Sequence, residues 1–163
     1  MSRPDKHNYY LDIAQTVAKR STCLRRNFGS IIVKNDVIIA TGYNGAPRGR
    51  INCDEHGACL RDELSIPRGE RYEMCRGVHA EANAIVAASR EQMLGATMYS
   101  ACVYPETGEP VPGTSSCPMC RRLIINAGID TVIQRETADT FTIYSVQDWI
   151  DNDEGITGVG GYA

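Results

Sequence analysis

The sequence predicts an α/β fold in which helices cover a mixed β-sheet. Periodic segments alternate along the chain in the order helix, strand hairpin, helix, strand, helix, strand. The 163 residues are enough to bury a core without disulfide staples, and they leave no room for a second domain. We therefore expect a single domain over residues 1–163, with no internal repeats.

A helix and a hairpin begin the chain. Apolar residues recur at helical spacing over residues 5–20, which predicts the helix. The β-branched runs 29–34 and 37–43 flank the turn pair Asn35-Asp36, and so short a connection predicts an antiparallel hairpin. The glycine-punctuated loop 43–50 then leaves the second strand where a sheet commonly presents binding groups.

Residues 51–78 show no convincing periodicity, and we call this segment the insert. It contains Cys53, His56, Cys59 and Cys75 among Arg, Glu, Gly and Pro. So long an irregular segment inside a compact domain needs some other source of order.

The second half of the chain alternates helices with strands. We expect helices over 79–88 and 120–128, strands over 95–101 and 131–134, an edge strand over 141–144 and a short amphipathic piece at Trp149-Ile150. The tail 152–163 is rich in glycine and is expected to be disordered.

Composition narrows the class of protein. The net charge of −3 disfavours a strongly basic nucleic-acid surface, and hence a polynucleotide partner. Residues 1–20 lack the apolar core of a signal peptide, and no apolar run reaches membrane-spanning length. We expect a cytoplasmic protein, whose seven cysteines act as metal ligands and buried thiols rather than disulfides.

Two short motifs carry the chemistry, His79-Ala80-Glu81 and Cys117-Pro118-Met119-Cys120. A catalytic zinc typically has three protein ligands and keeps a fourth position for water. His79, Cys117 and Cys120 meet that requirement. Glu81, two residues beyond His79, can reach the water without being a ligand. This is the pattern of zinc-dependent nucleobase deaminases.

Both motifs begin a predicted helix, with Pro118 suited to a first turn and Gly128 to a C-terminal stop. A helix N-terminus favours thiolate over thiol, and thiolate is the form that binds zinc. The alternative is an ordinary helical histidine with a buried or redox-active thiol pair. A Cys-x-x-Cys motif alone is ambiguous, but the paired motifs with their flanking helices favour zinc.

With these residues in view, the chain resembles the cytidine and deoxycytidylate deaminase family, most closely its deoxycytidine monophosphate (dCMP) deaminase branch. The resemblance runs from about residue 12 to residue 134. It rests on four segments, Gly42-Tyr43-Asn44-Gly45, residues 79–85, residues 95–99 and residues 117–120 with 124–129. Two departures, Ser116 in place of the usual proline and a longer connection after Tyr99, leave the motif residues in place.

The resemblance implies a three-layer α/β/α sandwich and a homo-oligomer, often a hexamer. It implies hydrolytic deamination of dCMP, with Glu81 moving protons to N3 and to the departing amine, and Asn44 contacting the deoxyribose. It also implies activation by dCTP and inhibition by dTTP. Arg25 or Arg26 is our candidate for the phosphate, because guanidinium pairs well with phosphate oxygens.

The remaining cysteines suggest a second, structural zinc. Cys102 follows a strand and is expected to be a plain buried thiol. The other four lie at a turn or in the insert, and some dCMP deaminases carry an additional zinc in this region. We expect the ligands Cys23, Cys53, Cys59 and Cys75, with His56 in reserve. The alternative is that these four cysteines are reduced thiols that bind no metal.

Two other functions stay open. An RNA-acting adenosine deaminase shares the zinc motif, but the acidic composition and the Gly-Tyr-Asn-Gly turn count against it. A non-catalytic, zinc-stabilised binding module would not need Glu81, and closed structural sites generally use four protein ligands. Sequence does not decide between dCMP, dCTP and a free nucleoside as substrate.

Overall fold

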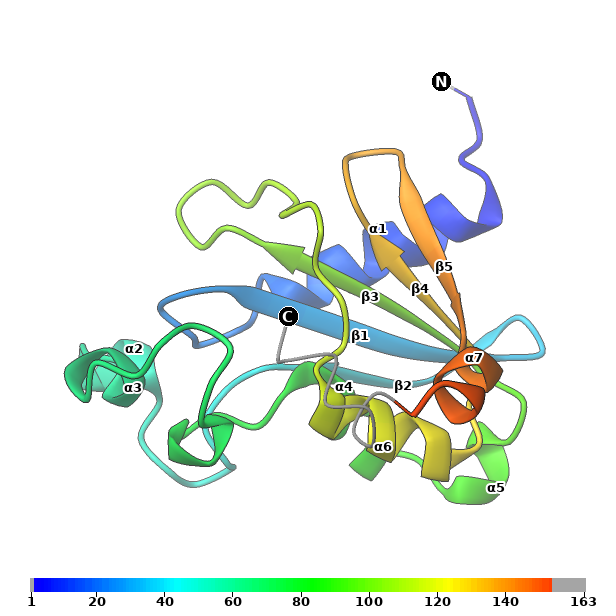
Figure 1. Ribbon diagram of the computed structural model, residues 1–163. Helices are drawn as coiled ribbons and strands as arrows, with labels where there is room; N and C mark the ends of the chain where they lie inside the picture. Colours follow the sequence, from blue (N-terminus) through cyan, green and yellow to red (C-terminus); the bar gives the residue numbers. More distant parts are fainter. Residues whose placement is uncertain (1, 154–163) are drawn as a thin grey trace.

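The structure is a computed structural model that describes residues 2–153. At its centre lies one five-stranded sheet in the order β2-β1-β3-β4-β5 (Figure 1). Strands β3 and β4 are parallel and the other neighbours are antiparallel, so the sheet is mixed. The strands are β1 (Asn27–Lys34), β2 (Val37–Tyr43), β3 (Thr97–Val103), β4 (Thr131–Arg135) and β5 (Phe141–Ser145).

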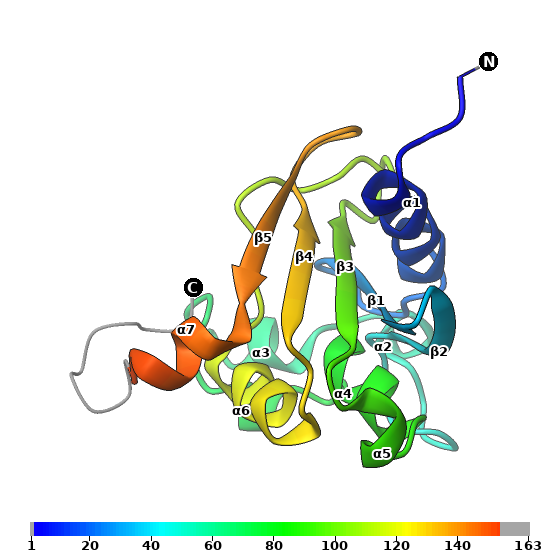
Figure 2. The same ribbon diagram turned by 90° about the vertical axis from the view of Figure 1, so that its right-hand side faces the viewer.

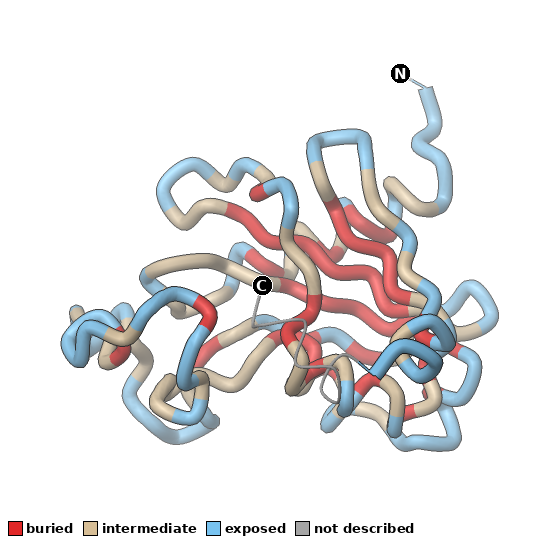
Figure 3. Tube along the Cα trace, in the orientation of Figure 1, coloured by how far each residue is buried: buried red, intermediate tan, exposed pale blue. Residues whose placement is uncertain are grey.

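Helices cover both faces of this sheet. Helix α1 (Lys6–Ala18) lies on one face, and helices α4 (Ala80–Val86) and α6 (Pro118–Ala127) lie on the other (Figures 1 and 2). Ile31 packs in the core beneath α1, whereas its neighbour Ile32 packs in the core that contains α4 and α6. This alternation follows from the two-residue period of a strand. The three-layer α/β/α prediction is confirmed, and burial is concentrated along the strands (Figure 3).

The hairpin and the edge strand lie where the sequence predicts them. Asn35 and Asp36 have φ angles of 51° and 61°, as a type I′ turn requires at both central positions. Among the described residues, strand β5 pairs with β4 alone and forms one edge of the sheet. The short helix α7 (Val146–Asp151) follows it.

Most differences between the predicted and the observed secondary structure are short helices that the sequence does not reveal. The insert contains three helical turns, α2 (Cys53–His56), α3 (Leu60–Glu63) and the 3₁₀ turn η1 (Tyr72–Met74), and α5 (Arg90–Met93) was also not expected. A single turn is too short to show a hydrophobic period. Helices α1 and α4 end two residues earlier than predicted, whereas α6 begins two residues earlier, at Pro118, and ends one residue earlier.

The tail prediction falls almost wholly on residues 154–163, which lie outside the described residues. Within residues 2–153, no helix combines the length and the apolar character needed to cross a membrane.

Backbone contact fixes helix α4 against the sheet. A Cβ atom on Gly42 of β2 would collide with the carbonyl oxygen of Ala80 and the amide nitrogen of Ala84. Only glycine lets the strand and the helix approach so closely. The Asn83 side chain, also on α4, donates a hydrogen bond of 2.8 Å to the carbonyl of Tyr43. These contacts hold the first turn of α4 at a fixed place over the sheet.

Candidate active site

The N-termini of two helices bring one histidine and two cysteines together. His79 is the N-cap residue of α4 and Cys117 is the N-cap residue of α6, yet neither side chain caps its own helix. The Nδ1 atom of His79 lies 3.5 Å from Sγ of Cys117 and 3.4 Å from Sγ of Cys120. All three ligand atoms lie within 4.8 Å of one another.

These separations suit a zinc ion. Zinc–sulfur and zinc–nitrogen bonds of ~2.3 and ~2.0 Å at a tetrahedral angle place the two ligand atoms about 3.5 Å apart. A hydrogen bond from Cys120, and next the His79 ring, lower the pKa of the Cys117 thiol. Thiolate is the form that binds the metal. The donor set therefore fits a zinc ion and leaves a fourth position for water.

Glu81 lies in the first turn of α4, two residues beyond His79. It is only 6% exposed, and burial raises the pKa of its carboxyl group. A carboxyl group whose pKa is shifted toward neutral pH can both accept and release a proton during a reaction. Its burial thus matches the role of a proton shuttle.

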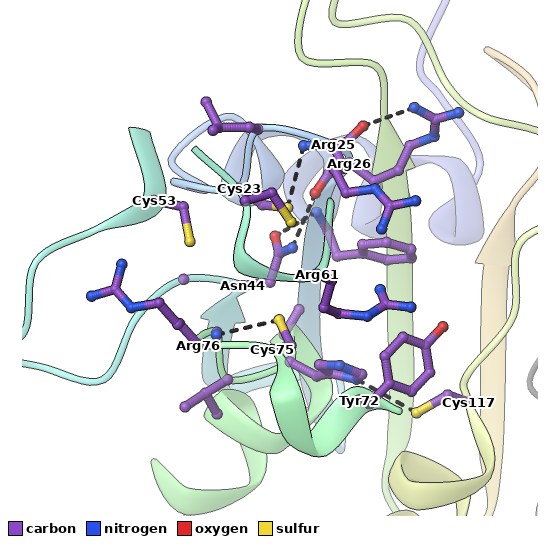
Figure 4. A pocket seen from close by; sticks show the side chains of 18 of the residues that line it. Cys23, Arg25, Arg26, Asn44, Cys53, Arg61, Tyr72, Cys75, Arg76 and Cys117 are labelled. Carbon is purple, nitrogen blue, oxygen red and sulfur yellow. Dashed lines mark hydrogen bonds between the residues drawn. The ribbon is translucent and has the colours of Figure 1, made fainter. Parts of the chain in front are cut away.

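His79, Glu81 and Cys117 line a cleft of about 250 Å³. Figure 4 shows this cleft from close by, with arginine, cysteine and aromatic side chains on its walls. The walls come from the loop before β1, the end of β2, the insert and the loop that leads into α6. Large clefts with a few convergent polar groups are the usual place for a small-molecule ligand.

A family model, that of the cytidine and deoxycytidylate deaminase zinc-binding region, matches residues 4–135. The chain belongs to this family. The motif residues His79, Glu81, Cys117 and Cys120 all lie inside the matched range.

Several curated relatives carry the name deoxycytidylate deaminase. The protein from Mycobacterium phage D29 is 40% identical over 139 residues, which cover 82% of this chain and 96% of the phage protein. The protein from Schizosaccharomyces pombe is 36% identical over 131 residues. Those residues are 80% of this chain but 37% of the yeast protein, so the chain spans little more than a third of that relative.

Solved structures agree with the fold. The dCMP deaminase from cyanophage S-TIM5, determined in complex with dCMP and dUMP, is 27% identical and superposes with a TM-score of 0.59. The match covers 98% of this chain and 97% of the phage chain. A cytidine deaminase from Burkholderia pseudomallei, 15% identical, has a TM-score of 0.58 over 88% of this chain and 95% of its own, and supports the fold alone.

In this deaminase-family chain, Asn44 lines the cleft, but its side chain is largely engaged by the protein itself. Its Oδ1 atom accepts hydrogen bonds from the Ser21 hydroxyl and from the amide of Phe28. Its Nδ2 atom donates to the carbonyl of Arg26. One N–H of the Asn44 amide is left for a ligand.

Arg25 and Arg26, the candidate phosphate-binding residues, both line the cleft. Arg25 approaches Asp62 of α3 at 3.5 Å, across the boundary between the core and the insert. The Arg26 guanidinium stacks over the Tyr104 ring at 4.8 Å and donates to the carbonyl of Arg25. Its Nε atom is buried and has no hydrogen-bond partner.

The four cysteines assigned to a second zinc all line the cleft wall, namely Cys23, Cys53, Cys59 and Cys75. The backbone amide of Arg25 donates to the Cys23 sulfur at 3.4 Å, and the amide of Gly77 donates to the Cys75 sulfur at 3.3 Å. These two hydrogen bonds fix the positions of both sulfur atoms on the cleft wall. Across residues 2–153, however, only His79, Cys117 and Cys120 form a tight group of ligand atoms. His56 is exposed and does not line the cleft.

Two residues of the insert, Arg61 and Tyr72, lie at the candidate site but could not be predicted from the sequence. Tyr72 places its ring 5.1 Å from the His79 ring in an edge contact, and the Arg61 guanidinium stacks over Tyr72 at 4.8 Å. Both line the cleft. No local motif marks them, because their position depends on how the insert folds over the core.

Proposed function

We propose that this chain catalyses the hydrolytic deamination of deoxycytidylate, turning dCMP and water into dUMP and ammonia. The observation that carries the proposal is the buried Glu81 beside the group His79, Cys117 and Cys120 at the cleft. The relatives named deoxycytidylate deaminase and the solved phage dCMP deaminase support the choice of substrate.

His79, Cys117 and Cys120 would hold a zinc ion, which supplies the Lewis acidity that makes water nucleophilic near neutral pH. Glu81 accepts the proton that the water loses as its oxygen bonds to C4 of the pyrimidine ring. The same carboxyl group delivers that proton to N3, then takes the second proton from the oxygen now bonded to C4 and gives it to the amino nitrogen, which leaves as ammonia when the C4–N bond breaks. One group acting as base and then as acid keeps the overall reaction balanced in protons.

The cleft walls suggest how a nucleotide would be held. Arg25 and Arg26 offer guanidinium groups for a 5′-phosphate, because charge-assisted hydrogen bonds to phosphate oxygens are strong. The remaining N–H of Asn44 would donate to an oxygen of the deoxyribose, since the other groups of this side chain are already hydrogen-bonded within the protein. Phosphate recognition would make dCMP a better substrate than deoxycytidine.

One assay tests the proposal most broadly. Deamination of dCMP, CMP, deoxycytidine and dCTP is followed side by side by the change in ultraviolet absorbance. We expect dCMP to have the highest kcat/KM of the four. Equal rates on deoxycytidine and dCMP would contradict the nucleotide specificity, and no rate on any of them would contradict the activity.

A second, structural zinc is part of the same proposal. Binding by Cys23, Cys53, Cys59 and Cys75 would tie the loop before β1 to the insert and add the ordering energy that the insert lacks. The backbone amides of Arg25 and Gly77, which donate to the sulfur atoms of Cys23 and Cys75, hold these two sulfur atoms at this wall. Each zinc needs reduced thiols, and all seven cysteines are unpaired, which supports a cytoplasmic location.

Metal analysis tests the second site. Protein prepared without chelator should contain about two zinc ions per chain, and the double variant Cys53→Ser/Cys75→Ser should contain about one. A single zinc ion per chain in the unmodified protein would contradict the second site.

Regulation and assembly complete the proposal. We expect a homo-oligomer, a hexamer as in many dCMP deaminases, in which dCTP activates and dTTP inhibits. Such coupling appears as sigmoidal dCMP saturation that dCTP makes hyperbolic. Hyperbolic saturation unchanged by either triphosphate would contradict it, and light scattering measures the oligomeric state.

A further inference from the structure

The insert places in the cleft a buried arginine, Arg61, that forms no ion pair with the described residues. Arg61 of α3 is only 7% exposed, although arginine is rarely buried without a partner. Its Nη2 atom donates to the backbone carbonyls of Pro67 and Glu70, at 3.0 and 2.7 Å. Within residues 2–153, no carboxylate forms an ion pair with it.

The rest of the Arg61 guanidinium makes no hydrogen bond to the described residues. Its Nε atom is buried and makes no hydrogen bond, and its Nη1 atom donates to no group of the described chain. A buried cation with unused donors is costly in an isolated protein. An anionic ligand in the cleft would satisfy both the charge and the donors.

Aromatic contacts hold this guanidinium in a fixed position relative to the candidate zinc ligands. Arg61 lies over the Tyr72 ring at 4.8 Å (Figure 4). The Tyr72 ring in turn lies 5.1 Å from the His79 ring. Two ring contacts thus separate the guanidinium from the His79 imidazole. Arg61, Tyr72 and His79 all line the same cleft, so a base near His79 and a phosphate near Arg61 would belong to one bound nucleotide.

Arg26 on the core side of the cleft has the same features. It too stacks over a tyrosine ring at 4.8 Å, has a buried Nε without a partner and takes part in no ion pair of residues 2–153. Arg25, in contrast, already approaches Asp62, the neighbour of Arg61 on α3. Arg26 and Arg61, the two cleft arginines that each stack on a tyrosine ring and have a buried Nε without a partner, thus come one from the core and one from the insert.

We propose that Arg61, together with Arg26, binds the 5′-phosphate of the substrate, so that the insert acts as the phosphate-recognition element of the active site. This rests on the proposed nucleotide deamination and adds to it a specificity-determining residue. The insert then matters for nucleotides more than for nucleosides. Cys59 is the N-cap residue of α3, so a metal bound at that wall would also position Arg61.

The test compares Arg61→Gln and Arg61→Lys with the unmodified enzyme on two substrates, dCMP and deoxycytidine. Arg61→Gln should lower kcat/KM for dCMP by about 10- to 100-fold, the usual effect of losing a charge-assisted hydrogen bond. Activity on deoxycytidine should change by less than about threefold, since the nucleoside has no phosphate. Arg61→Lys keeps the charge but loses the planar group, and should recover part of the dCMP activity.

Arg71→Gln provides the matched control. Arg71 belongs to the same insert and is exposed, but it pairs with Glu73 and does not line the cleft. Its replacement should leave both substrates unaffected. The zinc content of every variant should equal that of the unmodified protein.

A binding measurement separates this inference from the activity itself. Calorimetry of the zinc-loaded protein with dUMP and deoxyuridine needs no turnover, and Arg61→Gln should weaken only dUMP. Equal losses on nucleotide and nucleoside would show that Arg61 merely holds the loop at Pro67 and Glu70, and would overturn the proposal. Unmodified protein that binds dUMP no better than deoxyuridine would overturn it too. Selective weakening of dUMP binding without dCMP turnover would retain Arg61 and reject the proposed reaction.

Discussion

The side-chain carbonyl of Asn44 accepts a hydrogen bond of 2.8 Å from the backbone amide of Phe28, and its amide donates one of 3.0 Å to the carbonyl of Arg26. These bonds clamp the start of β1 to the residue that directly follows β2. Asn44 thus organises the loop that carries the candidate phosphate-binding arginines. A role in sugar contact would come in addition to this structural role.

Replacing Asn44 by Ala should therefore affect stability as well as catalysis. Buried polar partners left unsatisfied cost about 1–3 kcal/mol each, and we expect a loss of at least that size in the free energy of unfolding. Urea denaturation measures it. Asn126→Ala, at an exposed position of α6, is the control and should change stability by less than about 0.5 kcal/mol. A stable Asn44→Ala protein with a selectively raised KM for dCMP would show that ligand contact is its main role.

The approach of β2 to α4 predicts a severe effect of Gly42→Ala. The added methyl group would press on the backbone of α4 at Ala80 and Ala84, and overpacking of this kind costs about 1–3 kcal/mol. Because α4 carries His79 and Glu81, zinc retention and turnover should fall with stability. Thr41→Ala, at an exposed position of the same strand, should leave zinc content unchanged. Full zinc content and activity in Gly42→Ala would mean that the helix moves freely.

The hydrogen bond of Tyr10 should make the stability of the fold depend on pH in the alkaline range. Its hydroxyl donates to the Asp36 carboxylate, and this bond raises the pKa of Tyr10 from 10.0 to about 12. The neutral phenol is favoured in the folded state, so its stabilisation is complete below pH 10 and is lost as the pH rises from about 10 to about 12. Thermal unfolding of Tyr10→Phe should lose this part of the pH dependence. An identical alkaline profile in the variant would contradict the assignment.

Elements with a clear period could be predicted from the sequence, and elements without one could not. Ile31 and Ile32 alternate between the two faces of β1, and the turn residues Asn35 and Asp36 fit only a tight hairpin. The positions of His79 and Cys117 followed from motif spacing at two helix starts. All of this information is local in the chain.

The structure of the insert could not be predicted from such local patterns. Its helical turns are single, so no hydrophobic period reveals them. Arg61 acquires its character from Tyr72, Pro67 and Glu70, contacts that arise only when the insert folds back on itself. Likewise, Cys23 shares a cleft wall with Cys53 because the core and the insert meet there. Neither relationship can be derived from spacing.

The Glu81→Gln variant tests the central claim most directly. Glutamine has nearly the same shape as glutamate but cannot accept the water proton, so zinc content and thermal stability should match the unmodified protein. Turnover of dCMP should fall by ~100-fold or more, the effect expected of a general acid-base group. Glu106→Gln, on the exposed loop after β3, should retain full activity. A zinc-loaded Glu81→Gln protein that keeps more than about a tenth of the dCMP turnover would contradict the account.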